Sequence, residues 1–356
     1  MNYDGLNMGL VKQNNIASVL THIHCAGEAS RKEIAEKIGL TAASLSMITA
    51  PMVEEGLLEE IGTDKYPKGA GRKQVLLRLN YDYRYVFSVN IEKKTTYIAL
   101  TNLSGKAVDY AETETKGPQE LLGNVAEIIK HMLDRNSEIR SLVKSISVGV
   151  PGIVNRELGT STKAYGIWEE EVRIKDILQE KTGLKVFVEN AVYAFADAEI
   201  IFGLGRQYDN LLVLKWGPGV GSAVVIDGRI YEGRNGKAAE VGHLIVDRHG
   251  SLCECGRRGC LQTKIKDDVL KDINGEKFDE LLDIFADAIV NMITVLAPNR
   301  TVLCGSIFHE KDVYTRLVEK TKAIDENYDE KRIVLSALAD KERYIGPVAS
   351  FIVEHL

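Results

Sequence analysis

The feature that most constrains this 356-residue chain is a group of cysteines that follows a histidine at short range. A Glu-Val-Gly-His run ends at His243, and the next cysteines are Cys253, Cys255 and Cys260. One imidazole and three thiolates form the closed tetrahedral ligand set that zinc favours, and such closed sets are usually structural. The sequence therefore predicts a structural Zn²⁺ held by these four residues.

The residues between the cysteines favour this interpretation. Gly256 and Gly259 allow a short loop to turn back, so that the last cysteine reaches the same ion. Arg257 and Arg258 would offset part of the negative charge of three thiolates. The alternative is that three reduced cysteines lie near a histidine without binding a metal.

Composition narrows the class of protein. The chain is 45% hydrophobic and 27% charged, so it can bury a large core and is not a disordered chain. Its amino end lacks a basic start followed by an apolar core, and no apolar stretch reaches the roughly 18 residues of a membrane span. We therefore expect a cytoplasmic protein with no membrane partner. The net charge of −6 argues against a surface that coats nucleic acid, but a local DNA-binding module remains possible.

The first 80 residues have the pattern of three short helices. Apolar residues over 16–23 recur at the spacing of one helical face. Ser30-Arg31-Lys32-Glu33 matches a capping box, which starts a second helix that Gly39 can end in the left-handed conformation. Thr41 can cap a third helix after a tight turn. This order of elements is typical of a helix-turn-helix.

A basic loop follows the predicted helices. Residues 57–61 and 74–79 are predicted to pair as strands around it. Residues 61–80 hold five basic side chains against Asp64 alone, a local charge of +4, although residues 1–80 carry nine basic and nine acidic side chains. A basic loop beside a helix-turn-helix is typical of a wing that contacts DNA phosphates or the minor groove. The alternative is a solvated charge run on an ordinary hairpin.

The third helix is predicted to enter the major groove with small side chains, whose methyl groups can contact thymine methyls. Pro51 is expected to bend or end this helix near Ala50, and Thr49 is expected on its exposed face. Specificity would then come from few base contacts and from dimer spacing, with basic residues supplying phosphate affinity. The predicted DNA contacts are Arg31, Lys32, Thr41, Ala42, Ala43, Ser44, Ser46, Met47, Lys68, Arg72 and Lys73.

After residue 80 the pattern changes to strands alternating with helices. Strands are predicted over 85–91, 96–100 and 145–150. A comparable opening recurs over 211–226, where a glycine loop separates two strands and Asp227-Gly228 then forms a hairpin turn. Two similar α/β openings predict two lobes with a ligand cleft between them.

The run from Glu240 to Cys260 closely resembles the metal-binding signature of the ROK family, which contains repressors and sugar kinases. Gly-Val-Pro-Gly at 149–152, Val-Glu-Asn at 188–190 and the glycine loop at 217–221 fall in the family's order. With its amino-terminal winged helix, the chain resembles the branch of xylose and N-acetylglucosamine-type repressors.

This resemblance implies an α/β fold in which an N-terminal winged helix-turn-helix precedes a two-lobed, actin-like (ribonuclease-H-like) ROK domain, usually assembled as a dimer or tetramer. The implied domains are a DNA-binding domain over 1–80, a first lobe over 81–192 to which a C-terminal helix over 345–356 returns, and a second lobe over 193–344 with the zinc loop.

The resemblance also implies what a kinase of this family needs. Its general base is an Asp directly after an Asn, whereas this chain has Ala191 after Asn190. Loss of a positioned base typically costs ~10²–10⁴ in rate. The first phosphate loop reads Asn-Ile-Glu-Lys-Lys from Asn90, and Glu92 would place a carboxylate where triphosphate oxygens approach. We therefore expect no catalytic residues and no enzyme activity.

The sugar site is implied to be partly retained. His243 would use one ring nitrogen for zinc and the other for the ligand. Gln262 stands where the family has a glutamate, so the pocket is expected to prefer another sugar, a sugar derivative, or no ligand. The alternative for Glu240 is a solvated acid beside a metal loop. The implied effector contacts are Asn190, Glu240, His243 and Gln262.

Three functions remain open at this point. The first is a homo-oligomeric repressor of carbohydrate genes that binds double-stranded operator DNA and a sugar-like effector. The second is an ATP-dependent sugar kinase with an added DNA-binding domain. The third is a regulator controlled by a protein partner.

Overall fold

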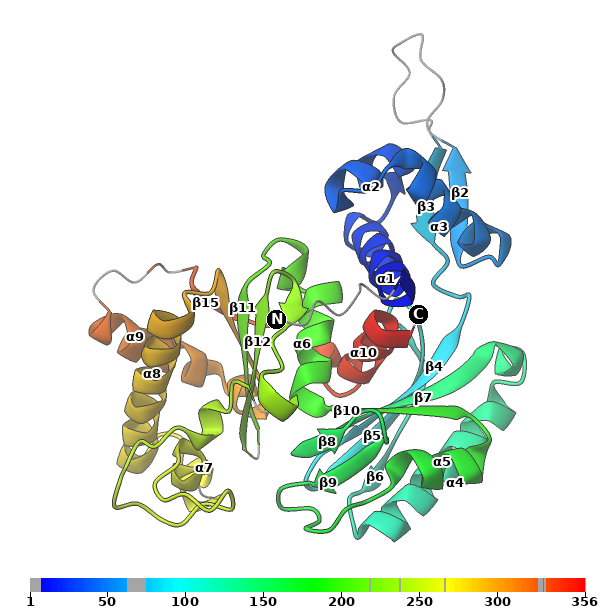
Figure 1. Cartoon of the computed structure of the whole chain (residues 1–356). Coiled ribbons are helices and arrows are strands. Elements are labelled where there is room, and N and C mark those ends of the chain that lie inside the picture. The colour runs from blue at the N-terminus through cyan, green and yellow to red at the C-terminus, as the bar shows by residue number, and fades with distance from the viewer. Residues whose placement is uncertain are drawn as a thin grey trace.

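The computed structural model describes residues 8–62, 75–217, 219–236, 238–265, 267–325, 329 and 331–355. An N-terminal head stands on two larger lobes (Figure 1). None of the helices in these ranges combines the length and the apolar character that a bilayer crossing requires.

The head consists of three helices and a small antiparallel sheet. The helices are α1 (Met8–Ala26), α2 (Arg31–Ile38) and α3 (Ala42–Glu54). The sheet has the order β1-β3-β2 and is built from β1 (Ala29–Ser30), β2 (Leu58–Gly62) and β3 (Val75–Leu79). The two predicted strands are confirmed to within one residue at each end, whereas the short β1 was not predicted. The predicted basic loop, with Lys65, Lys68, Arg72 and Lys73, lies outside the described residues.

Both predicted ends of the second helix and the predicted start of the third helix are confirmed. The Ser30 hydroxyl accepts a hydrogen bond from the Glu33 amide at 3.2 Å, and the Glu33 carboxylate accepts one from the Ser30 amide at 2.7 Å, which completes the capping box. Gly39 ends α2 with a φ of 71°. The Thr41 hydroxyl caps α3 by accepting from the Ser44 amide at 3.1 Å.

The prediction for Pro51 is a bend or an end of the third helix near Ala50, and the end is wrong, because α3 continues to Glu54. Pro51 lies in the last turn and is exposed, and Met47 one turn earlier is 79% exposed. The carbonyl that loses its amide donor at the proline therefore lies on the water-facing side of the helix, where solvent can hydrogen-bond it.

The expectation that Thr49 is exposed is also wrong. Thr49 is fully buried, where its hydroxyl donates to the Leu45 carbonyl at 3.0 Å. The same hydroxyl accepts from Arg31 Nε at 3.2 Å, and Arg31 Nη2 also lies 2.8 Å from Glu60 Oε1. Thr49 therefore helps to hold α3 against α2 instead of facing outward.

The first lobe is a five-stranded sheet of order β10-β7-β4-β5-β6. Its strands are β4 (Tyr85–Ile91), β5 (Thr95–Asn102), β6 (Ala107–Glu114), β7 (Val143–Val150) and β10 (Lys185–Asn190). The first three form an antiparallel meander, and β7 and β10 continue the sheet in parallel with β4. Two helices, α4 (Pro118–Arg135) and α5 (Ile174–Thr182), pack on it, and β8 (Ile153–Asn155) pairs with β9 (Thr160–Lys163) beside it.

The second lobe repeats this topology, with the order β13-β12-β11-β14-β15. Its strands are β11 (Leu211–Trp216), β12 (Val220–Ile226), β13 (Arg229–Ile230), β14 (Arg300–Cys304) and β15 (Ile333–Leu335). Its helices are α7 (Asp267–Lys271), α8 (Glu276–Leu296) and α9 (Lys311–Ile324). Again a meander of three strands is followed by two strands parallel to the first. The predicted duplication into two lobes is confirmed.

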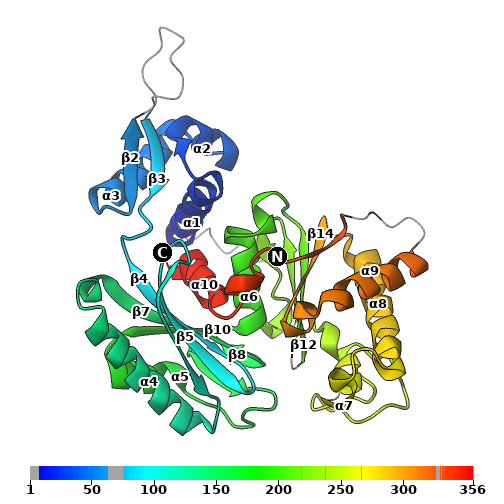
Figure 2. The same ribbon diagram turned by 180° about the vertical axis from the view of Figure 1, so that it is seen from behind.

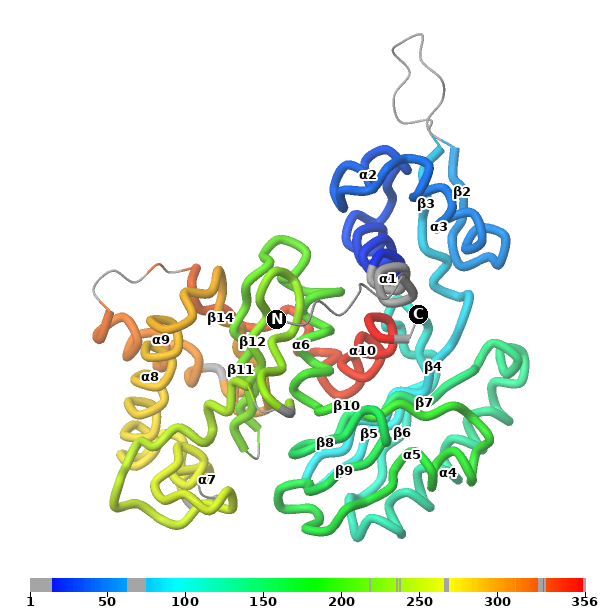
Figure 3. Tube along the Cα trace, viewed as in Figure 1, coloured from blue at the N-terminus to red at the C-terminus, as the bar shows by residue number. Residues whose placement is uncertain are grey.

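Two helices occupy the space between the sheets and below the head (Figures 2 and 3). They are α6 (Ala191–Ile201) and α10 (Ile345–His355), which pack against each other and each contact α1. One continuous apolar cluster joins their side chains to those of the head and of the second sheet. The predicted domain boundaries stay predictions, and the one between residues 192 and 193 falls inside α6.

Candidate functional site

The four predicted metal ligands come together in the second lobe. The ligand atoms of His243, Cys253, Cys255 and Cys260 all lie within 4.8 Å of one another. Cys255 Sγ is 3.6 Å from Cys260 Sγ, and Cys253 Sγ is 3.5 Å from His243 Nδ1. A tetrahedral site with Zn–S bonds of about 2.3 Å places neighbouring sulfurs about 3.8 Å apart. The donor set and its spacing therefore fit Zn²⁺, which would tie the loop together.

The loop reaches this geometry through its glycines and one arginine. Gly259 has a φ of 70°, and a Cβ added there would overlap the Asp247 carbonyl, so no other residue fits. Burial raises the pKa of Cys255, but hydrogen bonds from Arg257, Cys260 and Cys253 together outweigh burial and lower that pKa to about 7. Arg257 thus favours the thiolate form of Cys255, and the side chains of Arg257 and Arg258 are both exposed.

His243 connects the metal cluster to a cavity. Its Nδ1 faces Cys253, and its Nε2 lies 3.9 Å from Glu240 Oε2. Burial and the positive charge of Arg257 lower the pKa of His243, so the ring is neutral near pH 7 and can act as a ligand. Tyr165, from the first lobe, lies edge-on to the same ring at a centroid distance of 5.8 Å.

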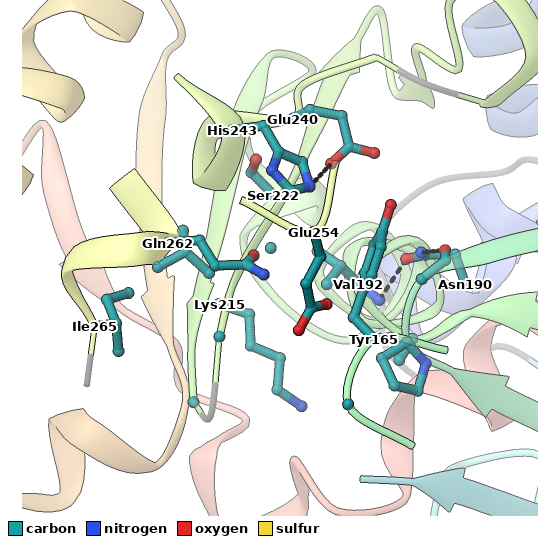
Figure 4. A pocket seen from close by; sticks show the side chains of 18 of the residues that line it. Tyr165, Asn190, Val192, Lys215, Ser222, Glu240, His243, Glu254, Gln262 and Ile265 are labelled. Atoms are coloured by element: carbon teal, nitrogen blue, oxygen red, sulfur yellow. Dashed lines mark hydrogen bonds and ion pairs between the residues drawn. The ribbon is translucent and has the colours of Figure 1, made fainter. Parts of the chain in front are cut away.

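The cavity lies between the two lobes and has a volume of about 430 Å³. Figure 4 shows that Glu240 and His243 lie along one side of it, with the Gln262 amide pointing inward and Tyr165 opposite. Three of the four predicted effector contacts therefore present polar groups to one space. The fourth, Asn190, also lines the cavity but is differently engaged.

Asn190 is the N-cap of α6. Its Oδ1 accepts hydrogen bonds from the amides of Val192 at 2.8 Å and Tyr193 at 3.2 Å. Its Nδ2 donates to the Gly152 carbonyl at 2.8 Å. The amide group of Asn190 therefore keeps one N–H for a ligand, and its main work is to start the helix.

A buried ion-pair group stands on the other side of the cavity. Lys215 Nζ, at the end of β11, lies 3.1 Å from Glu92 Oε1 of the first lobe and 3.2 Å from Glu342 Oε1. Burial lowers the pKa of Lys215, but the carboxylates of Glu342 and Glu92 raise it above its ordinary value. Asn90 Nδ2 donates to the same Glu92 oxygen at 3.4 Å. Two carboxylates around one ammonium leave this ion-pair group with a net negative charge, which disfavours a phosphate in contact with it.

The packing of the second lobe explains one glycine of the predicted glycine loop. The strand β12 begins at Val220, so Gly221 pairs with Lys215 across the sheet and does not belong to a loop over 217–221 as the resemblance implied. A Cβ at Gly221 would lie 2.5 Å from Val192 Cγ2, in the first turn of α6. Gly221 is needed for this close approach, without any phosphate.

The predicted DNA contacts that fall within the described residues lie on the head. Lys32, Thr41, Ala42, Ala43, Ser46 and Met47 are exposed, and Ser44 is half-buried beside Thr41. Arg31 is held by Glu60, and Arg78, part of the predicted basic run, pairs with Glu59 at 2.7 Å. The contacts stay predictions.

Sequence reasoning missed several residues that line the cavity. Lys215 carried a usable signal, because it is the single charge in an otherwise apolar strand and must find buried partners. Glu254, between two metal ligands, was visible as an acid in the loop. Tyr165 and Tyr193 gave no signal, since nothing in their local sequence shows that they face the cavity.

Known proteins are similar to this chain in sequence. The model of the ROK family matches residues 86–280. Over 259 residues, or 72% of this chain, the protein is 31% identical to a xylose repressor of Caldicellulosiruptor bescii, of which the match covers 64%. It is 30% identical over 260 residues, again 72% of this chain, to the DNA-binding transcriptional dual regulator NagC of Escherichia coli (strain K12), of which 63% is covered. The matches thus span less than two thirds of each relative.

Solved structures share the fold. A ROK family transcriptional regulator described as a homologue of the E. coli MLC protein superimposes with a TM-score of 0.77 at 22% identity, covering 96% of this chain and 97% of that one. A ROK family glucokinase from Streptomyces griseus, solved with glucose and AMPPNP, gives 0.63 at 20% identity, covering 74% of this chain and 98% of that one. This protein belongs to the ROK family.

Proposed function

We propose that this chain is a DNA-binding transcriptional regulator, a repressor of carbohydrate genes that responds to a sugar or sugar derivative in the cleft and has no kinase activity. The observation that carries the proposal is that a helix-turn-helix head is joined to a ROK cleft in which an ion-pair group occupies the side of the predicted first phosphate loop. This group consists of Lys215, Glu92 and Glu342. The names of its relatives, a xylose repressor and a DNA-binding transcriptional dual regulator, support it.

The cleft supports binding without phosphoryl transfer. Glu240, His243 and Gln262 offer carboxylate, imidazole and amide groups on one side, a donor and acceptor mixture that suits sugar hydroxyls. The position that the family resemblance gives to the general base is Ala191, whose methyl group accepts no proton. On the remaining side, Glu92 and Glu342 surround Lys215, so an added triphosphate would meet two carboxylates.

The head supports DNA binding. Over residues 42–50 of α3 the exposed side chains are small except for Met47, so this part of the helix can approach the floor of a major groove. Operator DNA is bound by a homo-oligomer, a dimer or tetramer, in which two heads meet two half-sites. Zn²⁺ at the cysteine cluster has a structural role and keeps His243 oriented toward the ligand. The protein acts in the cytoplasm.

The test is binding to the chain's own upstream DNA, measured by fluorescence anisotropy with D-xylose, N-acetylglucosamine, glucose and their phosphates added singly. We expect one sugar to change the operator Kd at least fivefold. Gln262→Ala is expected to weaken that sugar's binding about tenfold, while the matched control Gln179→Ala, exposed on α5, leaves it unchanged. ATP consumption with any of these sugars would favour the kinase, and operator binding that no sugar changes would favour control by a protein partner.

A further inference from the structure

The C-terminal ends of two helices meet between the head and the second lobe. His24, near the end of α1, is 6% exposed, and its ring lies edge-on to Tyr81 and Phe202 at centroid distances of 5.6 and 4.9 Å. Its Nδ1 lies 3.2 Å from the Tyr81 hydroxyl, and the ring also hydrogen-bonds the backbone of Ile201, the last residue of α6. His24 of the head thus contacts the C-terminal end of α6, a helix whose other end lines the cleft.

In a second contact, a side chain that follows α6 binds the backbone of the head. Arg206 follows α6, and its Nε donates to the Cys25 carbonyl at 3.1 Å, while its Nη2 donates to the carbonyls of Cys25 and, at 3.5 Å, His24. These carbonyls belong to the last turn of α1, where the helix itself supplies few amide donors; the Gly27 amide also donates to the His24 carbonyl at 3.2 Å. Two helix C-termini that face each other carry like partial charges, and the guanidinium offsets them. We call His24, Tyr81, Phe202 and Arg206 the head joint.

The other end of α6 lies in the cleft. Asn190 caps it, and Val192 packs over Gly221 beside the cavity. The Tyr193 hydroxyl donates to the carbonyls of Gly236 at 3.4 Å and Ala238 at 3.5 Å, in the segment that leads to Glu240. Between these ends α6 has 11 residues, about 16 Å of helix, and most of its side chains are buried. A shift at the cavity therefore moves the head joint with it, because a packed helix moves as a unit.

We propose that α6 is the element that couples effector binding to DNA binding. In this proposal Arg206 and His24 are positioning residues, through which a displacement of α6 changes the orientation of the head. This inference rests on the proposed function. Its two states are a head held by the joint and a head released from it, and the effector binds one of them more tightly.

The experiment uses the full chain and three variants. Arg206→Met removes the helix-end hydrogen bonds but keeps the length of the side chain, and His24→Phe keeps the ring but removes its hydrogen bonds. The control is Arg229→Met, an exposed arginine on β13 of the same lobe. Two quantities are measured with the sugars and sugar phosphates of the panel above as probes: the Kd for the sugar, and the ratio of operator Kd values with and without it.

We expect both joint variants to bind sugar and operator and to lose at least four fifths of the sugar-induced ratio, while the control keeps it. Hydrogen exchange, which needs no ligand, should rise at the amides near Gly27 and Tyr83 in both variants. A wild-type chain that binds no operator, or whose operator binding no sugar or sugar phosphate of the panel above changes, contradicts the proposed function. A responsive wild type whose joint variants respond equally, or show unchanged exchange, overturns this inference alone.

Discussion

Lys215 of the second lobe and Glu92 of the first lobe form an ion pair of 3.1 Å across the inner end of the cleft. The pair is anchored on the side of the second lobe, because Glu342 contacts the same ammonium and accepts a hydrogen bond from the Gly305 amide at 3.1 Å. The two lobes therefore share a buried charge group on one side of the cavity, and the opposite side is left for a ligand.

Replacing Lys215 by methionine is predicted to lower the free energy of unfolding by about 3–5 kcal/mol, because two carboxylates lose their shared cation in a largely buried place. Urea unfolding followed by tryptophan fluorescence measures it, since Trp216 is the next residue and is fully buried. The control is Lys130→Met, which breaks an exposed pair with Glu127 and should cost less than about 1 kcal/mol. Equal losses of unfolding free energy in the two variants would show that the ion-pair group in the cleft contributes no more to stability than an exposed pair.

Cys255→Ser is predicted to abolish retention of zinc, because a closed four-ligand site that loses one thiolate loses most of its affinity. Metal content after dialysis against a weak chelator is the measurement, and protease cleavage within residues 244–262 should rise in parallel. Cys25→Ser, outside the cluster, is the matched control and should keep one zinc per chain. Full zinc content in the Cys255 variant would mean that the ligand set is wrong.

Arg31 and Lys32 are neighbours on α2 with different surroundings, so their alanine variants should differ. Arg31 contacts Thr49 and Glu60, and Arg31→Ala is predicted to destabilise the head by about 1–2 kcal/mol as well as to weaken operator binding. Lys32 is largely exposed, so Lys32→Ala should leave stability unchanged and reduce the salt slope of operator binding by about one. Thermal unfolding and anisotropy at several salt concentrations separate the two, and identical behaviour would contradict the assignment.

His24 predicts a pH dependence of stability. Burial and the charge of Arg206 lower its pKa from 6.5 to about 4, so between these values the unfolded chain binds a proton that the folded chain does not. Its contribution is complete above pH 6.5 and is lost as the pH falls toward 4. The free energy of unfolding of the wild type, relative to His24→Phe, should drop by about 2–3 kcal/mol between pH 7.5 and 4.5. A difference that stays constant with pH would contradict the buried neutral ring.

The sequence predicted those features of the fold that depend on residues close together in the chain. The capping box at Ser30 and the left-handed cap at Gly39 were readable because the interacting groups lie three or four residues apart. The metal ligands were readable because donor chemistry and short spacing restrict what three thiols and an imidazole can do. Pro51 misled, because the exposure of the helix face that carries it depends on tertiary packing.

The rest of the site depends on contacts between segments far apart in sequence. Lys215 meets Glu92 across 123 positions, and Arg206 meets Cys25 across 181, so no local pattern identifies either pair. Asn190 shows the converse difficulty. A family resemblance assigns it to the ligand, whereas its local position as a helix cap already uses most of its hydrogen-bonding capacity.

The most direct test of the account is the affinity of the full-length protein for its own upstream DNA, measured with and without the sugar that binds its cleft, with ATP hydrolysis followed in the same samples. The account predicts operator binding that this sugar changes at least fivefold, with no ATP consumed. Steady sugar-dependent ATP consumption together with operator affinity that no sugar alters would contradict it.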